Sequence, residues 1–138
     1  MATDAFEEIV DDFEFLEDWE DRYRYVIEKG KAMDPLPDAL KVEATRVRGC
    51  ASQVWLHPDL SDGTFRFDGD SDAMIVRGLV AILIAFYDGR PVEDVPSLDV
   101  HGFLRSLELD DHLTPQRSNG LSSMVKRIRR DAAELVSA

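Results

Sequence analysis

The stretch from Ala73 to Tyr87 constrains the fold of this chain more than any other part of the sequence. Apart from Arg77 it is apolar on all sides, whereas a helix at the surface of a globular protein has one apolar stripe. Its uninterrupted apolar run, 79–87, is far shorter than the roughly 20 residues that cross a bilayer. We therefore expect a buried central helix over 73–87, with N-cap candidates in Asp70-Ser71-Asp72.

Amphipathic helices are predicted on both sides of this central helix, because apolar residues recur there at helical spacing. They are expected near 3–16 and 18–32, in short pieces at 91–96 and 100–107, and in a final helix capped by Ser118 or Asn119. The apolar face of the final helix consists of Leu121, Met124, Val125, Ile128, Ala132 and Leu135. The segment Asp34-Pro35-Leu36-Pro37 ends the second helix, because proline cannot donate to the helical hydrogen-bond ladder.

Alternating apolar and polar residues predict three short antiparallel strands, at 45–48, 53–57 and 64–67. A turn signal, Ser61-Asp62-Gly63, precedes the third strand, and residues 49–52 connect the first two. The fold class predicted is α+β, with a small three-stranded antiparallel sheet packed against several helices. A chain of 138 residues suits a single domain, here 1–138, with one core.

The acidic charge of the chain restricts the partners that it can have. The net charge is −12 at pH 7, whereas nucleic acids and anionic membrane surfaces attract basic proteins. Residues 1–21 contain acids and no bases, and residues 115–130 contain bases and no acids. We interpret these runs as solvated helix faces, with two docking faces of opposite sign as the alternative.

The cysteine content indicates a reducing compartment. Cys50 is the single cysteine, so no intrachain disulfide can form. The acidic N-terminus is the opposite of a signal or transit peptide. Together these features predict a cytoplasmic protein.

Cys50 has the most distinctive chemistry of any residue in the chain. A cysteine is often a buried, inert hydrophobe, and on composition alone that interpretation is equally good. Its position favours a reactive thiol, because Cys50 follows Gly49 and lies among Arg48, Ser52 and Gln53, outside any predicted strand or helix. Backbone N–H groups of such a loop can stabilise a thiolate, and Arg48 is a candidate for additional positive potential.

Several kinds of chemistry use a thiol in this way. A sulfur relay needs the least, since one exposed thiol that becomes a persulfide is sufficient. A cysteine hydrolase needs a histidine within reach, and His57 is the nearest in sequence. A metal site would combine Cys50 with Asp72 and a histidine, without a recognisable ligand spacing, and a cluster scaffold usually offers several thiolates. The relay is the most economical hypothesis, and the hydrolase and the metal or cluster scaffold are the alternatives.

Four segments of the sequence also resemble those of a known family. They are Trp19–Ile27, Arg48–Trp55, Gly69–Leu79 and His112–Leu121. In this order they resemble the early helix, the cysteine loop, the central motif and the C-terminal motif of the SufE/CsdE family. Members of this family are sulfur acceptors that serve cysteine desulfurases in iron–sulfur cluster assembly. Four collinear motifs spanning nearly the whole chain make the resemblance specific.

The resemblance implies a fold and a mechanism. The family fold is α+β and similar to that of the IscU-like cluster scaffold proteins. A pyridoxal-phosphate cysteine desulfurase, SufS- or CsdA-like, holds sulfur as a persulfide, and the thiolate of Cys50 is expected to attack its outer sulfur. Cys50 would then pass the sulfur to a downstream iron–sulfur scaffold, so the chain would be an accessory protein without a cofactor or metal of its own.

Residues around the thiol are expected to support the loop or the partner. They are Arg48, Gly49, Ser52, Gln53, Asp72 and Arg117. Asp72 either caps the 73–87 helix or contacts the cysteine loop or partner, and Arg117 is either a surface charge or braces the loop. Trp55 is expected in the core and Gly78 at a close helix contact. Two residues depart from the family pattern, Ala51 where glutamine is common and Thr45 where asparagine is common.

Overall fold

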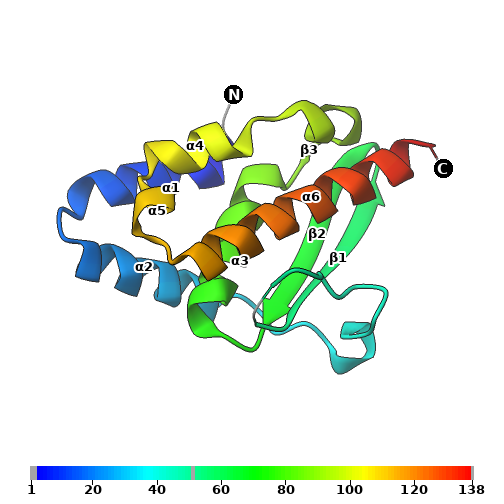
Figure 1. Cartoon of the computed structure of the whole chain (residues 1–138). Coiled ribbons are helices and arrows are strands. Elements are labelled where there is room, and N and C mark those ends of the chain that lie inside the picture. Colours follow the sequence, from blue (N-terminus) through cyan, green and yellow to red (C-terminus); the bar gives the residue numbers. More distant parts are fainter. Residues whose placement is uncertain (1–2, 51, 138) are drawn as a thin grey trace.

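The structure is a computed structural model that describes residues 3–50 and 52–137, and it consists of a small antiparallel sheet with helices packed against one of its faces (Figure 1). The elements in chain order are α1 (Asp4–Phe15), α2 (Trp19–Ala32), η1 (Asp38–Leu40), β1 (Val54–Ser61), β2 (Thr64–Ser71), α3 (Met74–Tyr87), β3 (Arg90–Pro91), η2 (Val92–Ser97), α4 (Val100–Ser106), α5 (Leu109–His112) and α6 (Pro115–Ser137). The predicted α+β fold class is confirmed. None of the helices in the described ranges is long and apolar enough to cross a membrane.

Helix α3 is the central element of the core, as its sequence predicts. It packs against α1 and α2 on one side and against β2 on the other. Leu79, Val80, Leu83 and Phe86 are all within 1% of complete burial. Burial of each such side chain contributes about 1.5–3 kcal/mol, so α3 orders the elements around it.

The sheet has three strands in the order β1-β2-β3, but its third strand is not the predicted one. Residues 45–48 form only an isolated bridge, between Arg46 and Trp55, and β3 instead pairs with the start of β2. The guanidinium of Arg127, on α6, binds the carbonyl oxygens of Ala44 and Arg46, which draws this segment toward the helix. Gly49 then turns the chain away from β1 with a φ of +89°.

Strands β1 and β2 are longer than the sequence pattern indicates, and the turn between them is the predicted one. Ser61 pairs with Thr64, so the turn has two residues, and both Asp62 and Gly63 have positive φ. Pro58 lies inside β1, which is tolerated because β1 is an edge strand. Trp55 is half-exposed rather than in the core, since its neighbours in β1 take the buried face.

Helix α6 begins three residues before the predicted cap, at Pro115. Proline is favoured at the first position of a helix, because its missing N–H would have no partner there. Thr114 acts as the cap, and its hydroxyl oxygen accepts the N–H of Arg117 at 3.3 Å. The predicted apolar face is confirmed from Leu121 to Ala132, while Leu135 is only partly buried.

Helices α2 and α3 cross at unusually short range, as expected for Gly78. A Cβ atom on Gly78 would lie 2.1 Å from the carbonyl oxygen of Val26. On the other helix, a Cβ on Gly30 would lie 2.7 Å from the amide nitrogen of Gly78. The two backbones are therefore in direct contact, and no side chain fits between them.

Replacing Gly78 with alanine is expected to lower the free energy of unfolding by about 3 kcal/mol, because the clash is with backbone that moves only with the whole of α2. Gly120→Ala is the control. In α6 the new Cβ would lie 3.6 Å from the Cys50 sulfur, an ordinary contact, and alanine favours helix by about 1 kcal/mol over glycine. Urea unfolding followed by circular dichroism compares the two variants, and equal stabilities would contradict the packing argument.

Candidate functional site

The cysteine loop, residues 47–53, crosses α6 at very short distance. A Cβ atom on Gly49 would lie 2.5 Å from the hydroxyl oxygen of Ser123 on that helix. The φ of +89° at Gly49 is in the region that disfavours residues with a side chain. Glycine at position 49 thus allows both the positive φ and the close approach to Ser123. As a result, Cys50 lies against the side of α6.

The chain that enters the loop is fixed to α6 by Arg127. Its Nη1 donates to the carbonyl oxygen of Arg46 at 2.9 Å, and its Nη2 donates to that of Ala44. Its Nε lies 3.0 Å from both carboxylate oxygens of Asp131, one helical turn further along α6. Asp131 therefore fixes the orientation of the Arg127 guanidinium that binds the chain entering the loop.

The chain that leaves the loop is fixed by Asp72. The N–H of Gln53 donates to Oδ1 of Asp72 at 3.0 Å, and the N–H of Asp72 donates to the carbonyl oxygen of Gln53 at 3.3 Å. The N-cap position of α3 is Ala73, which has no side-chain capping bond. The prediction that Asp72 caps this helix is wrong, and its contact with the cysteine loop is present.

A buried carboxylate that the sequence analysis did not single out supports this end of the sheet. Asp70 accepts the N–H of Leu36 at 3.0 Å, and its other oxygen lies 2.9 Å from Nε of Arg77. Burial alone would raise the pKa of Asp70, but the N–H donors and the charges of Arg77 and Lys41 outweigh it and lower the pKa. Asp70 thus ties the 34–37 segment to β2 and α3.

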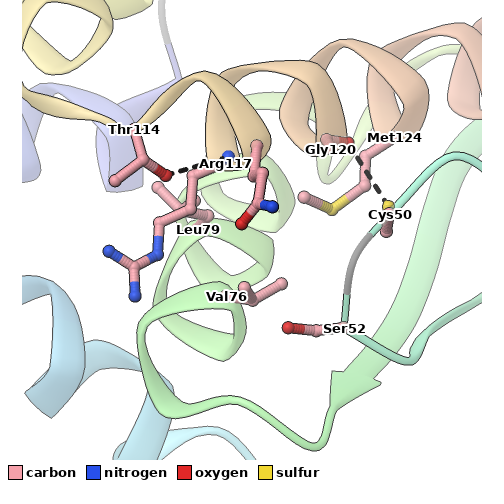
Figure 2. A pocket seen from close by; sticks show the side chains of 9 residues that line it. Cys50, Ser52, Val76, Leu79, Thr114, Arg117, Gly120 and Met124 are labelled. Atoms are coloured by element: carbon pink, nitrogen blue, oxygen red, sulfur yellow. Dashed lines mark hydrogen bonds between the residues drawn. The ribbon is translucent and has the colours of Figure 1, made fainter.

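Cys50 lines a cavity of about 200 Å³ between α3, α6 and the loop (Figure 2). The lining residues are Cys50, Ser52, Val76, Leu79, Thr114, Gln116, Arg117, Gly120 and Met124. The apolar ones come from the two long helices, and the polar ones come from the loop and the start of α6. The cavity therefore combines an apolar floor with polar groups at its edge.

The thiol itself is half-buried and has one polar neighbour. Its Sγ lies 3.6 Å from the carbonyl oxygen of Gly120, to which the S–H donates. Burial raises the pKa of Cys50 above that of a free thiol. The free protein thus holds this cysteine in its protonated, less nucleophilic form at neutral pH.

The two predicted arginines lie in different surroundings. Arg48 does not line the cavity; its side chain is 82% exposed, and its Nη2 lies 2.7 Å from a Glu43 oxygen. The expectation that Arg48 adds positive potential at the sulfur is therefore wrong. Arg117 does line the cavity, and Figure 2 shows its guanidinium on the side away from Cys50. No carboxylate within the described ranges forms an ion pair with it.

The structure thus brings together Cys50, Ser52 and Arg117, with Gly49 and the Gln53–Asp72 contact supporting the loop. Sequence reasoning missed the carbonyl of Gly120 and the other α3 and α6 side chains of the cavity, which are Val76, Leu79, Gln116 and Met124. A glycine inside the apolar pattern of the last helix was the available signal, because it indicates a close approach.

The two residues that depart from the family pattern are Thr45 and Ala51, and the structure describes only the first. Thr45 is buried, and its hydroxyl bonds the turn before the loop, donating to the carbonyl of Leu40 and accepting the N–H of Val42 at 3.3 Å. Thr45 thus stabilises that turn. Ala51 lies outside the described residues.

Neither alternative chemistry has its residues assembled. In the described part of the chain, no hydrogen bond joins the Cys50 sulfur to a histidine, and His57 lies on β1 rather than at the cavity. Among the same residues, no three side chains of the metal-ligating types converge. The proposed set of Cys50, Asp72 and a histidine is therefore not brought together.

Replacing Gly49 with alanine is expected to destabilise the protein and to displace the thiol. The positive φ costs about 1–2 kcal/mol in strain, and the clash with Ser123 adds to it. Gly63→Ala is the matched control, with a φ of +80° and no atom within 4 Å of the new Cβ. Thermal unfolding and the rate of Cys50 alkylation measure both effects. If the Gly49 and Gly63 variants had the same thermal stability and the same alkylation rate, the loop would not be pressed against α6.

Comparisons with known proteins identify the family of this chain. The sequence model of SufE, described as the Fe-S metabolism associated domain, matches residues 7–132. An uncharacterized SufE-like protein of Rhizobium etli is 51% identical over 132 residues, which cover 93% of this chain and 89% of that protein. One of Rhizobium meliloti is 46% identical, with coverage of 93% and 94%.

A solved structure has the same fold. It is the solution structure of a hypothetical protein from Thermus thermophilus, with a TM-score of 0.80 and 23% sequence identity. The similarity extends over 100% of both chains. From the match over residues 7–132 and the two close relatives, this chain belongs to the SufE family, the Fe-S metabolism associated domain.

Proposed function

We propose that this protein is a sulfur carrier that accepts sulfane sulfur from a cysteine desulfurase onto Cys50 and passes it on for iron–sulfur cluster assembly. The observation that supports this most is the single thiol at the edge of a preformed cavity, on a loop fixed at both ends. Family membership in Fe-S metabolism agrees with it. The donor is a pyridoxal-phosphate enzyme of the SufS or CsdA type, and this chain is its accessory protein.

The transfer is a thiol exchange that conserves atoms and electrons. The Cys50 thiolate attacks the outer sulfur of the donor persulfide, a new S–S bond forms at Cys50, and the donor S–S bond breaks. The donor cysteine leaves as a thiolate and takes up the proton that Cys50 lost. Cys50 then carries the persulfide, and the donor thiol is free for another turnover, so desulfurase activity increases.

The cavity suits the persulfide that this step creates. Val76, Leu79 and Met124 provide apolar surface that excludes water from the outer sulfur. The Arg117 guanidinium is a cation without a carboxylate partner in the described structure, and because it lies on the side away from Cys50 it is available to an anionic group of the docked donor. Ser52 adds a hydroxyl group on the loop side.

The half-buried thiol also implies that docking activates it. A protonated cysteine with a raised pKa reacts slowly with oxidants, which protects it in the free protein. A donor that displaces the loop from Gly120 would expose the sulfur and remove the burial that raises its pKa. Rapid reaction is then confined to the docked complex, where proximity also favours transfer.

Incubation with a cysteine desulfurase and cysteine is expected to add sulfur to the wild-type protein in steps of about 32 Da, the mass of one sulfur atom in a persulfide. Intact-mass spectrometry measures this, and a reducing agent should remove the addition. Cys50→Ser should gain no mass and should not stimulate the desulfurase, whereas Ser122→Ala is a control in α6 outside the cavity lining. Sulfur delivery by the Cys50→Ser variant would refute the proposal.

Alkylation of Cys50 by iodoacetamide is expected to depend on pH in a way that reports burial. In the unfolded chain the rate should rise through the ordinary thiol pKa, about 8.5. In the folded protein the midpoint should be higher, because burial raises the pKa. The same shift should make the fold less stable above about pH 8.5, where only the unfolded thiol ionises freely. Coincident rate profiles for folded and urea-unfolded protein would contradict the burial argument.

A further inference from the structure

A basic hollow lies beside the cysteine loop, between the 43–48 segment and α6. It has a volume of about 450 Å³. Its cationic lining residues are Arg46, Arg48, Lys126, Arg127 and Arg130. These are 5 of the 16 lysines and arginines in a chain whose net charge is −12. The basic hollow is therefore a positive area on an otherwise acidic protein.

Most of this positive charge is available to a partner. Arg48 pairs with Glu43 at 2.7 Å, but the two side chains are 82% and 72% exposed, and such pairs contribute only about 0–1 kcal/mol. Arg130 lies 3.8 Å from both Asp131 and Glu134, at the limit of an ion pair. An incoming carboxylate can therefore replace these contacts at low cost.

Two further cations have no carboxylate partner among the residues that the structure describes. They are Arg46 and Lys126, neither of which forms an ion pair there, and Lys126 is exposed. Arg127 differs, because its guanidinium already binds Asp131 and two backbone carbonyls. The hollow thus has a firmly bound arginine at its base, and the cations around it are weakly paired or, among the described residues, unpaired.

The basic hollow is adjacent to the reacting thiol through the loop itself. Gly49 packs on Ser123, which lines the hollow, while the next residue, Cys50, lines the thiol cavity. A specific protein interface covers about 800 Å² on each partner, far more than the mouth of a cavity this size. A protein that brings a persulfide to Cys50 must therefore also cover surface beside the loop.

The distribution of charge indicates what that protein presents. In Figure 1 the acidic connection between α1 and α2 lies at the end of the molecule opposite the 43–48 segment. That end repels an acidic partner, whereas the basic hollow attracts it. The electrostatic field of the protein therefore orients the cysteine loop toward an acidic partner. A basic partner would be drawn to the wrong end.

We propose that the basic hollow is the docking site for an acidic surface of the sulfur donor, seated beside the cysteine loop. This inference rests on the proposed sulfur-carrier function. The contacts are carboxylates of the donor with Arg46, Arg48, Lys126 and Arg130. They orient the donor, and they take no part in the bond exchange at Cys50.

The test reverses two exposed charges of the hollow, Lys126→Glu with Arg130→Glu. The control, Arg66→Glu with Arg105→Glu, makes the same change in net charge on β2 and α4. Each protein is titrated into a purified cysteine desulfurase with cysteine, and sulfur loading of Cys50 is followed by mass spectrometry at low and high salt. Circular dichroism and iodoacetamide alkylation check the fold and the free thiol. A milder variant, Lys126→Gln with Arg130→Gln, is measured in parallel in case the reversal disturbs α6.

We expect the hollow variant to raise the half-saturating concentration at least about tenfold at low salt, with an unchanged maximal rate. The glutamine variant should have a smaller effect, the control variant little, and high salt should abolish the differences. If the wild-type protein is loaded with sulfur but the hollow and control variants have equal half-saturating concentrations, the docking site is overturned and the carrier function is not. Absence of loading in the wild type, with any desulfurase tried, would overturn both.

Discussion

The position of the thiol depends on one guanidinium. Arg127 is held by the buried Asp131 on its own helix, and it binds two alternate carbonyls of the chain that enters the cysteine loop. Because hydrogen-bonding groups alternate along an extended segment, those carbonyls lie on the side away from β1, which pairs with Thr45 and Val47. Arg127 therefore ties the outer side of this segment to α6. That tie sets the approach of the chain to Cys50.

The cysteine loop has to satisfy two opposing requirements, accessibility and protection of the thiol. For the proposed sulfur-carrier function, the thiol must be accessible to a partner protein, and it must resist oxidation before that partner docks. Contact with α6 satisfies the second demand by burying half of the side chain, and it raises the pKa. The two ends of the loop are fixed by Arg127 and Asp72, so a partner that exposes the thiol needs to displace only the contact of Cys50 with α6. In the proposed function, docking of the donor exposes the thiol, so the same residue is protected in the free protein and reactive in the complex.

Much of the fold follows from the sequence because its strongest signals are local. The apolar helix α3, the turn at Asp62-Gly63 and the apolar face of α6 each depend on residues close in sequence. The third strand was misplaced because residues 45–48 form only one bridge to β1, whereas Arg90-Pro91, far along the chain, pairs with β2. The thiol was found from composition and motif, but its cavity was not, since α3 and α6 line it from separate parts of the chain. Only tertiary structure shows which way Arg48 points.

The outer edge of β1 has a consequence for how this protein meets others. The N–H of Leu56 is taken by the carbonyl of Thr45, Pro58 has no N–H, and the N–H of Leu60 bonds to the side chain of Asp59. An open sheet edge invites another chain to add a strand, in amyloid-like stacking or in peptide capture. Here three alternate positions along that edge are closed to such pairing. Backbone pairing at this edge is therefore disfavoured, and recognition by side chains, which discriminates better between partners, is favoured instead.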